Sequence, residues 1–171
     1  MKLSLDYIAG LIDADGSFNI SVIFKEGVKY KQIELRPVVN FRCLDKYSDV
    51  AESVQETLGV GKIYNHSGGR NFKMVTWQTT KKEESLYVAE VLIPYLHIKK
   101  SIALEFADIT RSWIYGKKDN YSIVLGEISR PEELVVELAR RAIDLNDCNQ
   151  TETNKPKRLA TLKRISEFLE S

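Results

Sequence analysis

Two carboxylates, Asp13 and Asp15, are separated by a single residue near the end of the short apolar run Ile8–Ser17. Carboxylates and backbone carbonyls are the oxygen ligands that hard divalent cations such as Mg²⁺ prefer. The same run holds Gly10, although glycine costs a helix interior about 1 kcal/mol relative to alanine. Something other than helix stability must therefore favour this glycine.

The carboxylates lie at the junction of a predicted helix and a predicted strand. Ser4 is a good N-cap and Asp6 falls in the first turn, so we expect a helix over about residues 5–14. Residues 17–25 alternate between apolar and polar and are rich in β-formers, which predicts a strand. A second strand is expected over about residues 30–43, with Pro37 as an interruption or a bulge.

The remaining elements complete a repeated helix–strand–strand order. The pattern predicts a helix over 46–58, strands over 62–65 and 72–80, and helices over 83–92, 99–115, 132–145 and 159–169. Paired strands of this kind form a four-stranded antiparallel sheet with helices on one face. We therefore expect an α+β fold whose second sheet face is free.

Composition places the chain among ordinary globular proteins. Of its 171 residues, 43% are apolar and 29% charged, and the formal net charge is +1. No apolar run approaches the roughly 18 residues that span a bilayer, and no signal-peptide pattern is present. Cys43 and Cys148 are too few for a metal site or disulfide framework. We expect an intracellular protein without a membrane partner.

The segment from Ile8 to Gly16 closely resembles the LAGLIDADG signature of homing endonucleases, with one conservative change at its first letter. Three further segments resemble family features: Gly59-Val-Gly61, Pro94 to Lys100, and Leu145-Asn-Asp147. The resemblance implies a single endonuclease domain over residues 1–171. Its αββαββα core would cover about residues 4–115, and a helical C-terminal extension about 116–171.

The signature occurs once in the chain, and single-motif members of the family act as homodimers. Small residues at Ala9 and Gly10 would let two helix backbones approach closely at a two-fold axis. The expected dimer interface comprises Ile8, Ala9, Gly10, Ile12 and Asp13. The alternative is that Gly10 packs against a helix of its own chain.

The family resemblance also assigns the chemistry. It implies that Asp15 is the essential metal ligand, that the backbone carbonyl of Ala14 shares the ligation, and that the ion is Mg²⁺. Asp13 is either a second acid near the metal or a hydrogen-bonding residue around the helix pair. Lys99 matches the basic residue beside the active site, where an ammonium stabilises transition-state charge, and Lys100 is the alternative if the alignment shifts by one.

The chain departs from the family at the end of the second strand. Members often carry a Gln there and a basic residue four positions on, and the count from Gly59 places these positions on Cys43 and Tyr47. Neither residue can do the same work. Their neighbours Arg42 and Lys46 could compensate.

A second set of residues is expected to contact DNA. Strands laid along the major groove read base edges with alternate side chains. Counting from Asp15, the outward set is Asn19, Ser21, Ile23 and Lys25, then Gln32, Glu34, Arg36, Val38, Asn40 and Arg42, then Tyr64 and His66, then Asn71, Lys73 and Val75. A slip of one residue would invert each set. Lys155 and Arg158 could add phosphate contacts.

The resemblance implies a Mg²⁺-dependent, homodimeric endonuclease that cuts both strands of a long, nearly palindromic DNA target. Members of the family cut across the minor groove, leave 3′ overhangs and promote mobility of their host intron. The runner-up is a non-cleaving nucleic-acid binder on the same fold, either an RNA-splicing maturase or a transcription regulator. A structural protein that uses the signature helix only to dimerise would not explain the polar outward set.

Overall fold

The first helix ends where the first strand begins, so that Asp15 and Gly16 form the joint between them. The structure is a computed structural model that describes residues 2–27, 30–67, 73–116, 122–124, 127–129, 132–148, 160–165 and 167. Helix α1 (Leu5–Asp15) starts at Ser4, whose Oγ accepts a hydrogen bond from the Tyr7 amide at 3.3 Å. The predicted helix and its cap are confirmed.

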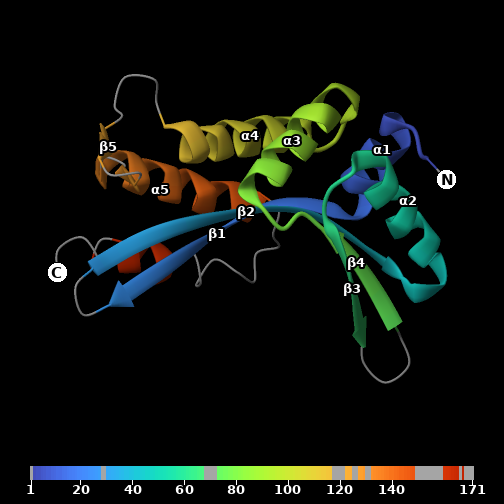
Figure 1. The fold of residues 1–171 in the computed structure, drawn as a ribbon, viewed down its shortest axis with the longest axis horizontal. Helices are drawn as coiled ribbons and strands as arrows, with labels where there is room; N and C mark the ends of the chain where they lie inside the picture. The colour runs from blue at the N-terminus through green and yellow to red at the C-terminus, as the bar shows by residue number, and fades with distance from the viewer. Residues whose placement is uncertain are drawn as a thin grey trace.

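Four antiparallel strands form the central sheet in the order β1-β2-β4-β3. The strands are β1 (Gly16–Gly27), β2 (Tyr30–Leu44), β3 (Lys62–Ser67) and β4 (Lys73–Gln78). Strand β1 pairs with β2 along its whole length, and the two form a long ribbon. The contact between β2 and β4 is shorter and involves only residues 40–44 of β2. Figure 1 shows an arched sheet, with the β1–β2 ribbon leaving on one side and the β3–β4 hairpin on the other.

The helices gather on one face of this sheet (Figure 1). They are α2 (Ser48–Leu58), α3 (Lys82–Leu92), α4 (Lys100–Tyr115) and α5 (Glu132–Cys148), with short 3-10 turns at Asp45–Tyr47 and Ile93–Tyr95. Between the layers, Phe18, Phe41, Trp77 and Phe106 are fully buried. The α+β fold predicted from the sequence is therefore confirmed, and among the described residues no helix is long and apolar enough to cross a membrane.

The segment after α4 differs from the expected helical extension. Two short strands, β5 (Ser122–Val124) and β6 (Glu127–Ser129), form a hairpin of their own. Three-residue strands carry too little alternation to be told from a loop by sequence. Residues 160–165 are helical, and the guanidinium of Arg164 lies 4.6 Å from the ring centroid of Phe24 on β1.

Gly16 is required by the tight joint between α1 and β1. A Cβ at this position would lie 2.6 Å from the Ile12 Cα and 2.9 Å from the Ile12 carbonyl oxygen. Because both atoms belong to the backbone of the preceding turn, they cannot move aside without bending the helix.

We therefore expect Gly16→Ala to lower the free energy of unfolding by about 2 kcal/mol, the usual cost of overpacking. Urea denaturation followed by circular dichroism would measure the loss. Glu52→Ala, a truncation of an exposed residue on α2, is the control and should change stability by less than about 0.5 kcal/mol. Equal stabilities of the Gly16→Ala variant and the wild type would contradict the steric argument.

Candidate functional site

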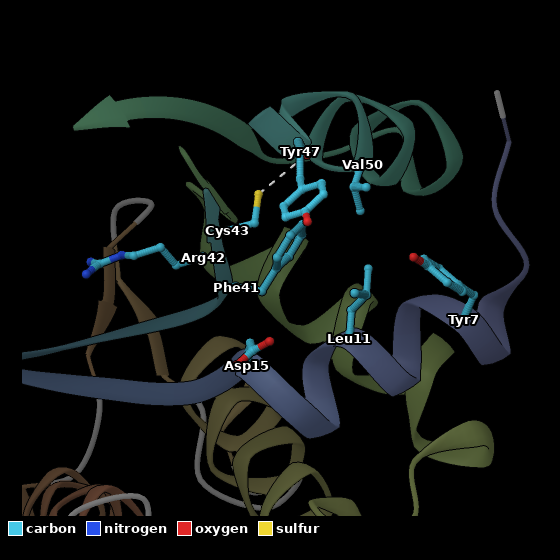
Figure 2. Close-up of a pocket in the computed structure, with 8 residues that line it drawn as sticks. All are labelled: Tyr7, Leu11, Asp15, Phe41, Arg42, Cys43, Tyr47 and Val50. Atoms are coloured by element: carbon cyan, nitrogen blue, oxygen red, sulfur yellow. Dashed lines mark hydrogen bonds between the residues drawn. The ribbon is translucent and has the colours of Figure 1, made fainter. Parts of the chain in front are cut away.

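Asp15 is exposed at the C-terminal end of α1, at the edge of a pocket of about 270 Å³. Figure 2 shows it below Phe41, with Leu11 and Tyr7 following along the same helix. The pocket is lined by Tyr7, Leu11, Asp15, Phe41, Arg42, Cys43, Tyr47 and Val50. An exposed carboxylate here is free to bind a cation or to face another molecule.

Asp13 and Lys99 hold the end of α1 against the start of α4. The Asp13 carboxylate accepts three backbone hydrogen bonds, from His97 at 2.8 Å, Ile98 at 3.1 Å and Lys99 at 2.8 Å. In return, the Lys99 ammonium donates to the carbonyl oxygens of Ile12 at 2.8 Å and Gly16 at 2.7 Å. These five hydrogen bonds cross-link two segments more than 80 positions apart.

The pKa values of both groups reflect this arrangement. Burial alone would raise the pKa of Asp13, but the three amides of residues 97–99 and the Lys99 charge outweigh it and lower the pKa below its ordinary value. Burial lowers the pKa of Lys99, opposed by the nearby charges of Asp13 and Asp15. An ammonium has three donors, and two of these point at carbonyls, so one remains for a substrate beside Asp15.

The oxygen donors at the end of α1 fit one half of a magnesium site. Asp15 offers an exposed carboxylate, and the Ala14 carbonyl comes after that of Ile12, which accepts the cap amide of Gly16, so it has no donor within the helix. Within the described part of the chain, no group of three or more His, Cys, Asp or Glu side chains comes together. Asp15 and Ala14 together offer only part of the six-oxygen shell of Mg²⁺, which usually keeps several water ligands.

The strand register places most of the expected DNA-contacting residues on one face of the sheet. Asn19, Ser21 and Ile23 on β1 pair with Val38, Arg36 and Glu34 on β2, and partners in register share a face. Asn40, Arg42, Tyr64 and His66 lie on this same face. We call this surface the saddle face, defined by the odd-numbered residues of β1 and the even-numbered residues of β2, β3 and β4.

The prediction for β4 was wrong by one residue. Val75 is fully buried and pairs with Cys43, so it faces the helices, and Lys73 has the same parity although it is exposed at the strand end. The residues that β4 contributes to the saddle face are Met74, Thr76 and Gln78. The bulk of Trp77, which is fully buried, was the signal that could have set this parity.

Comparison with known proteins decides the family. The sequence model described as LAGLIDADG endonuclease matches residues 8–110, which is more than half of the chain. The chain belongs to the LAGLIDADG endonuclease family. No curated protein matches the sequence.

Solved structures of homing endonucleases share the fold. The archaeal intron-encoded I-Vdi141I, complexed with DNA, superposes with a TM-score of 0.72 at 22% identity, covering 98% of this chain and 97% of that one. I-CvuI, in complex with the I-CreI target, gives 0.70 at 18% identity over 95% and 94%. I-TnaI gives 0.67 at 16% identity over 99% and 98%.

The LAGLIDADG helix α1 presents a different face to solvent from the one predicted. Ile8, Ala9 and Ile12 are completely buried, and Asp13 is 8% exposed and bonded to residues 97–99, so these four face the chain's own core. Their assignment to a dimer interface was wrong. Gly10 is exposed, and a Cβ added there would meet nothing within 4 Å.

The open side of the LAGLIDADG helix is therefore formed by Tyr7, Gly10 and Ala14, with Leu11 half-buried at its edge. Gly10 does not pack against another helix of its own chain within the described residues. Small residues three or four positions apart leave the backbone accessible to a second helix.

The strand register also shows which face of the sheet is occupied by Cys43, one of the two residues onto which the family positions were counted. Cys43 faces the helices, and its Sγ donates to the Tyr47 carbonyl oxygen at 3.6 Å. Burial, with a smaller contribution from Asp49, raises the pKa of the Cys43 thiol. Arg42 instead lies on the saddle face, where its Nε donates to Thr76 Oγ1 at 3.2 Å, so Arg42 is the residue that a ligand on this face would meet.

Some predicted contacts fall outside the described part of this LAGLIDADG chain. These are Asn71, Lys155 and Arg158, and the side chain of Gln32. Their roles stay predictions.

Proposed function

We propose that the chain is a divalent-metal-dependent, sequence-specific DNA endonuclease that acts as a homodimer. The observation that carries this proposal is the exposed Asp15 at the end of α1, beside an ammonium held by two carbonyls and next to the saddle face. Family membership supports the reaction class. Because the proposed substrate is DNA, we further propose that the protein acts inside the cell. We also propose that residues 1–171 work as one domain.

The saddle face supports the substrate side of the proposal. It carries amides, hydroxyls and basic groups, which are the side-chain types that read base edges in the major groove. Close to Asp15, Asn19 Nδ2 donates to Ser17 Oγ at 2.6 Å, and Ser17 Oγ donates to Asn40 Oδ1 at 3.2 Å. These polar groups are thus held in position before a ligand arrives, which lowers the entropic cost of binding.

The reaction we propose is hydrolysis of a phosphodiester in each DNA strand. Asp15 and the Ala14 carbonyl would hold Mg²⁺, which activates water and stabilises charge on the attacking and leaving oxygens. The remaining N–H of the Lys99 ammonium would donate a hydrogen bond to the scissile phosphate, where negative charge builds up. The family precedent points to cuts across the minor groove that leave 3′ overhangs and promote copying of a host intron.

The open side of α1 supports the homodimer. If two α1 helices meet at Gly10 and Ala14, each chain brings one Asp15 to a shared site, one for each DNA strand. We expect Gly10→Leu to raise the dimer dissociation constant at least tenfold, because the added side chain separates the two backbones. Light scattering over a dilution series would measure it, with Glu52→Leu as the exposed control. A Gly10→Leu protein as dimeric as the wild type would contradict the interface.

A selection experiment tests the function without knowledge of the target. Random-sequence duplexes are bound to the protein in Ca²⁺, and the enriched sequences are then incubated with protein and Mg²⁺. We expect an enriched, nearly palindromic site and a double-strand cut within it. Enrichment without cleavage in Mg²⁺ or Mn²⁺ would favour the non-cleaving binder, and tighter binding to a parallel pool of structured RNA than to the duplexes would favour the maturase.

Glu34 lends itself to a test of how the saddle face meets DNA. It is the carboxylate that the described side chains of β1–β4 direct to this face, and it forms ion pairs with Lys25 and, at 3.4 Å, with Arg36. The bond from Lys25 outweighs partial burial and, with the Arg36 charge, holds the pKa of Glu34 below its ordinary value. Glu34 is therefore charged at neutral pH and competes with phosphates for both cations.

We expect Glu34→Gln to bind random-sequence DNA about threefold to tenfold more tightly, with a steeper dependence on salt because two cations are released to phosphates. Fluorescence anisotropy at several salt concentrations would measure both quantities. Glu52→Gln, the same change on exposed helix α2, controls for net charge. Unchanged affinity and slope would show that Lys25 and Arg36 do not face the DNA backbone.

A further inference from the structure

A proline sits in the middle of the long β1–β2 ribbon, and it dictates which backbone groups point outward. Pro37 on β2 is in register with Ile20 on β1. Antiparallel partners either exchange two hydrogen bonds or turn their backbone groups away from each other, and proline has no N–H to exchange. The amide and carbonyl of Ile20 therefore point to the free edge of the sheet, and the Pro37 carbonyl points to the opposite side.

Side chains from two helices bind these outward groups. Asn146, near the end of α5, accepts from the Ile20 amide through Oδ1 at 3.0 Å and donates to the Ile20 carbonyl through Nδ2 at 2.8 Å. On the other side, Ser85 of α3 donates to the Pro37 carbonyl at 2.9 Å. Ser85 is fully buried, and its Oγ lies 2.7 Å from Thr79 Oγ1. Thr79 Oγ1 in turn accepts a hydrogen bond from the Val39 amide at 3.0 Å.

The Asn146 amide replaces a neighbouring strand. It presents one donor and one acceptor to a single residue of an edge strand, which is the pattern that a further β-strand would offer. Ile20 is thus the point at which the edge of the sheet is closed by α5, and α5 also packs along β1. Ser85 and Asn146 hold the ribbon at the same register from its two sides.

The hydrogen bonds of Asn146 and Ser85 to the ribbon, which we call the clamp, lie where the ribbon loses its other support. Strand β4 pairs with residues 40–44 of β2 and reaches no farther, so from Pro37 outward β1 and β2 have only each other within the sheet. Two-stranded ribbons twist more freely than wider sheets and are marginally stable alone. The residues next to the clamp, Asn19 and Ser21 on β1 and Arg36 and Val38 on β2, all lie on the saddle face.

We infer that Asn146 and Ser85 are positioning residues for DNA recognition, which clamp the ribbon at Ile20 and Pro37 and so fix where Asn19, Ser21 and Arg36 meet the bases. The inference rests on the proposed function for its consequence but not for its geometry. A clamp that fails would leave phosphate contacts in place, because those tolerate small shifts, while base contacts require correct alignment.

The first test needs no DNA. In the purified wild-type protein and in Asn146→Ala, amide hydrogen exchange is followed by NMR. Loss of the acceptor should speed exchange of the Ile20 amide at least tenfold relative to amides of β3, whereas Glu133→Ala, an exposed truncation on the same helix, should leave it unchanged. Equal protection of Ile20 in Asn146→Ala and the wild type would overturn the clamp.

The second test reads specificity. Asn19→Ala and Ser21→Ala first identify the target positions at which these residues discriminate between bases. At those positions we expect Asn146→Ala and Ser85→Ala to reduce discrimination at least fivefold, with less than a twofold change in binding to random DNA and in its salt slope. Asn146→Asp keeps an acceptor for the Ile20 amide but loses the donor, so an intermediate loss is expected.

The outcomes separate this inference from the proposed function. A uniform loss of affinity for all targets, or lower thermal stability with unchanged discrimination, would assign Asn146 a structural role alone and overturn the inference. Faster Ile20 exchange in a protein whose wild type shows no sequence preference would instead leave the clamp standing and refute the proposed function. If Asn146→Ala does not fold, Asn146→Asp and Ser85→Ala provide the same comparison.

Discussion

Asp15→Asn is expected to abolish cleavage while DNA binding persists. The substitution keeps the size of the side chain but removes the charge that a hard cation requires. We expect a loss of about a thousandfold or more in the rate of cleavage, corresponding to about 4 kcal/mol of transition-state stabilisation. Because Asp15 is exposed at the end of α1, the free energy of unfolding should change little.

Mixed dimers make this prediction specific to a shared site. One wild-type chain paired with one Asp15→Asn chain retains a single Asp15, so we expect the target duplex to be nicked in one strand or cleaved far more slowly. Gel electrophoresis of supercoiled plasmid separates nicked from linear product, and anisotropy measures binding. Asp6→Asn, at the other end of α1, is the control. Double-strand cleavage by the Asp15→Asn homodimer at wild-type rates would refute the proposed active site.

The elements of the fold were predictable because their signals are local. Ser4 and Gly16 mark the two ends of α1, and alternation over residues 17–25 predicts β1. The β5–β6 hairpin escaped prediction because three-residue strands have almost no period to detect. Contacts such as Asn146 with Ile20 are also invisible in sequence, since they join positions 126 residues apart.

The proposed dimer face of α1 shows where periodicity fails. A helix that packs on its own core and also faces a second copy is apolar or small on both sides, so hydrophobic pattern does not say which side is which. Ala9 and Gly10 are adjacent and equally small, yet Ala9 is fully buried and Gly10 is exposed. The two roles are assigned by tertiary packing.

One-residue counts were the other source of error. On β4, the count placed Val75 outward, although the loop before the strand gives no fixed starting point, and Val75 is buried. On β2, the family position counted onto Cys43 faces the helices, and its neighbour Arg42, which the sequence offers as a substitute, lies on the saddle face. Because side chains alternate, a slip by one residue exchanges the two faces completely.

Asp13→Asn is expected to lower the free energy of unfolding by about 3 kcal/mol. Both carboxylate oxygens of Asp13 accept backbone N–H groups of residues 97–99. Asparagine would turn an amide N–H₂ toward one set of these donors, leaving buried groups without an acceptor. The same segment positions the Lys99 ammonium, which donates to the carbonyls of Ile12 and Gly16. A less rigid segment should therefore reduce cleavage as well.

The pH dependence distinguishes this charge from a merely polar contact. The folded pKa of Asp13 is below its ordinary value, so folding favours the ionised form. The stabilisation is fully present above the unfolded pKa of about 3.9 and is lost as the pH falls through the folded pKa. The difference in unfolding free energy between wild type and Asp13→Asn should therefore be constant above about pH 5 and shrink below pH 4. Urea titrations at each pH measure it, with Asp6→Asn as the control for an exposed carboxylate on the same helix. A difference that stays constant down to acid unfolding would show that the Asp13 charge does not hold α1 to α4.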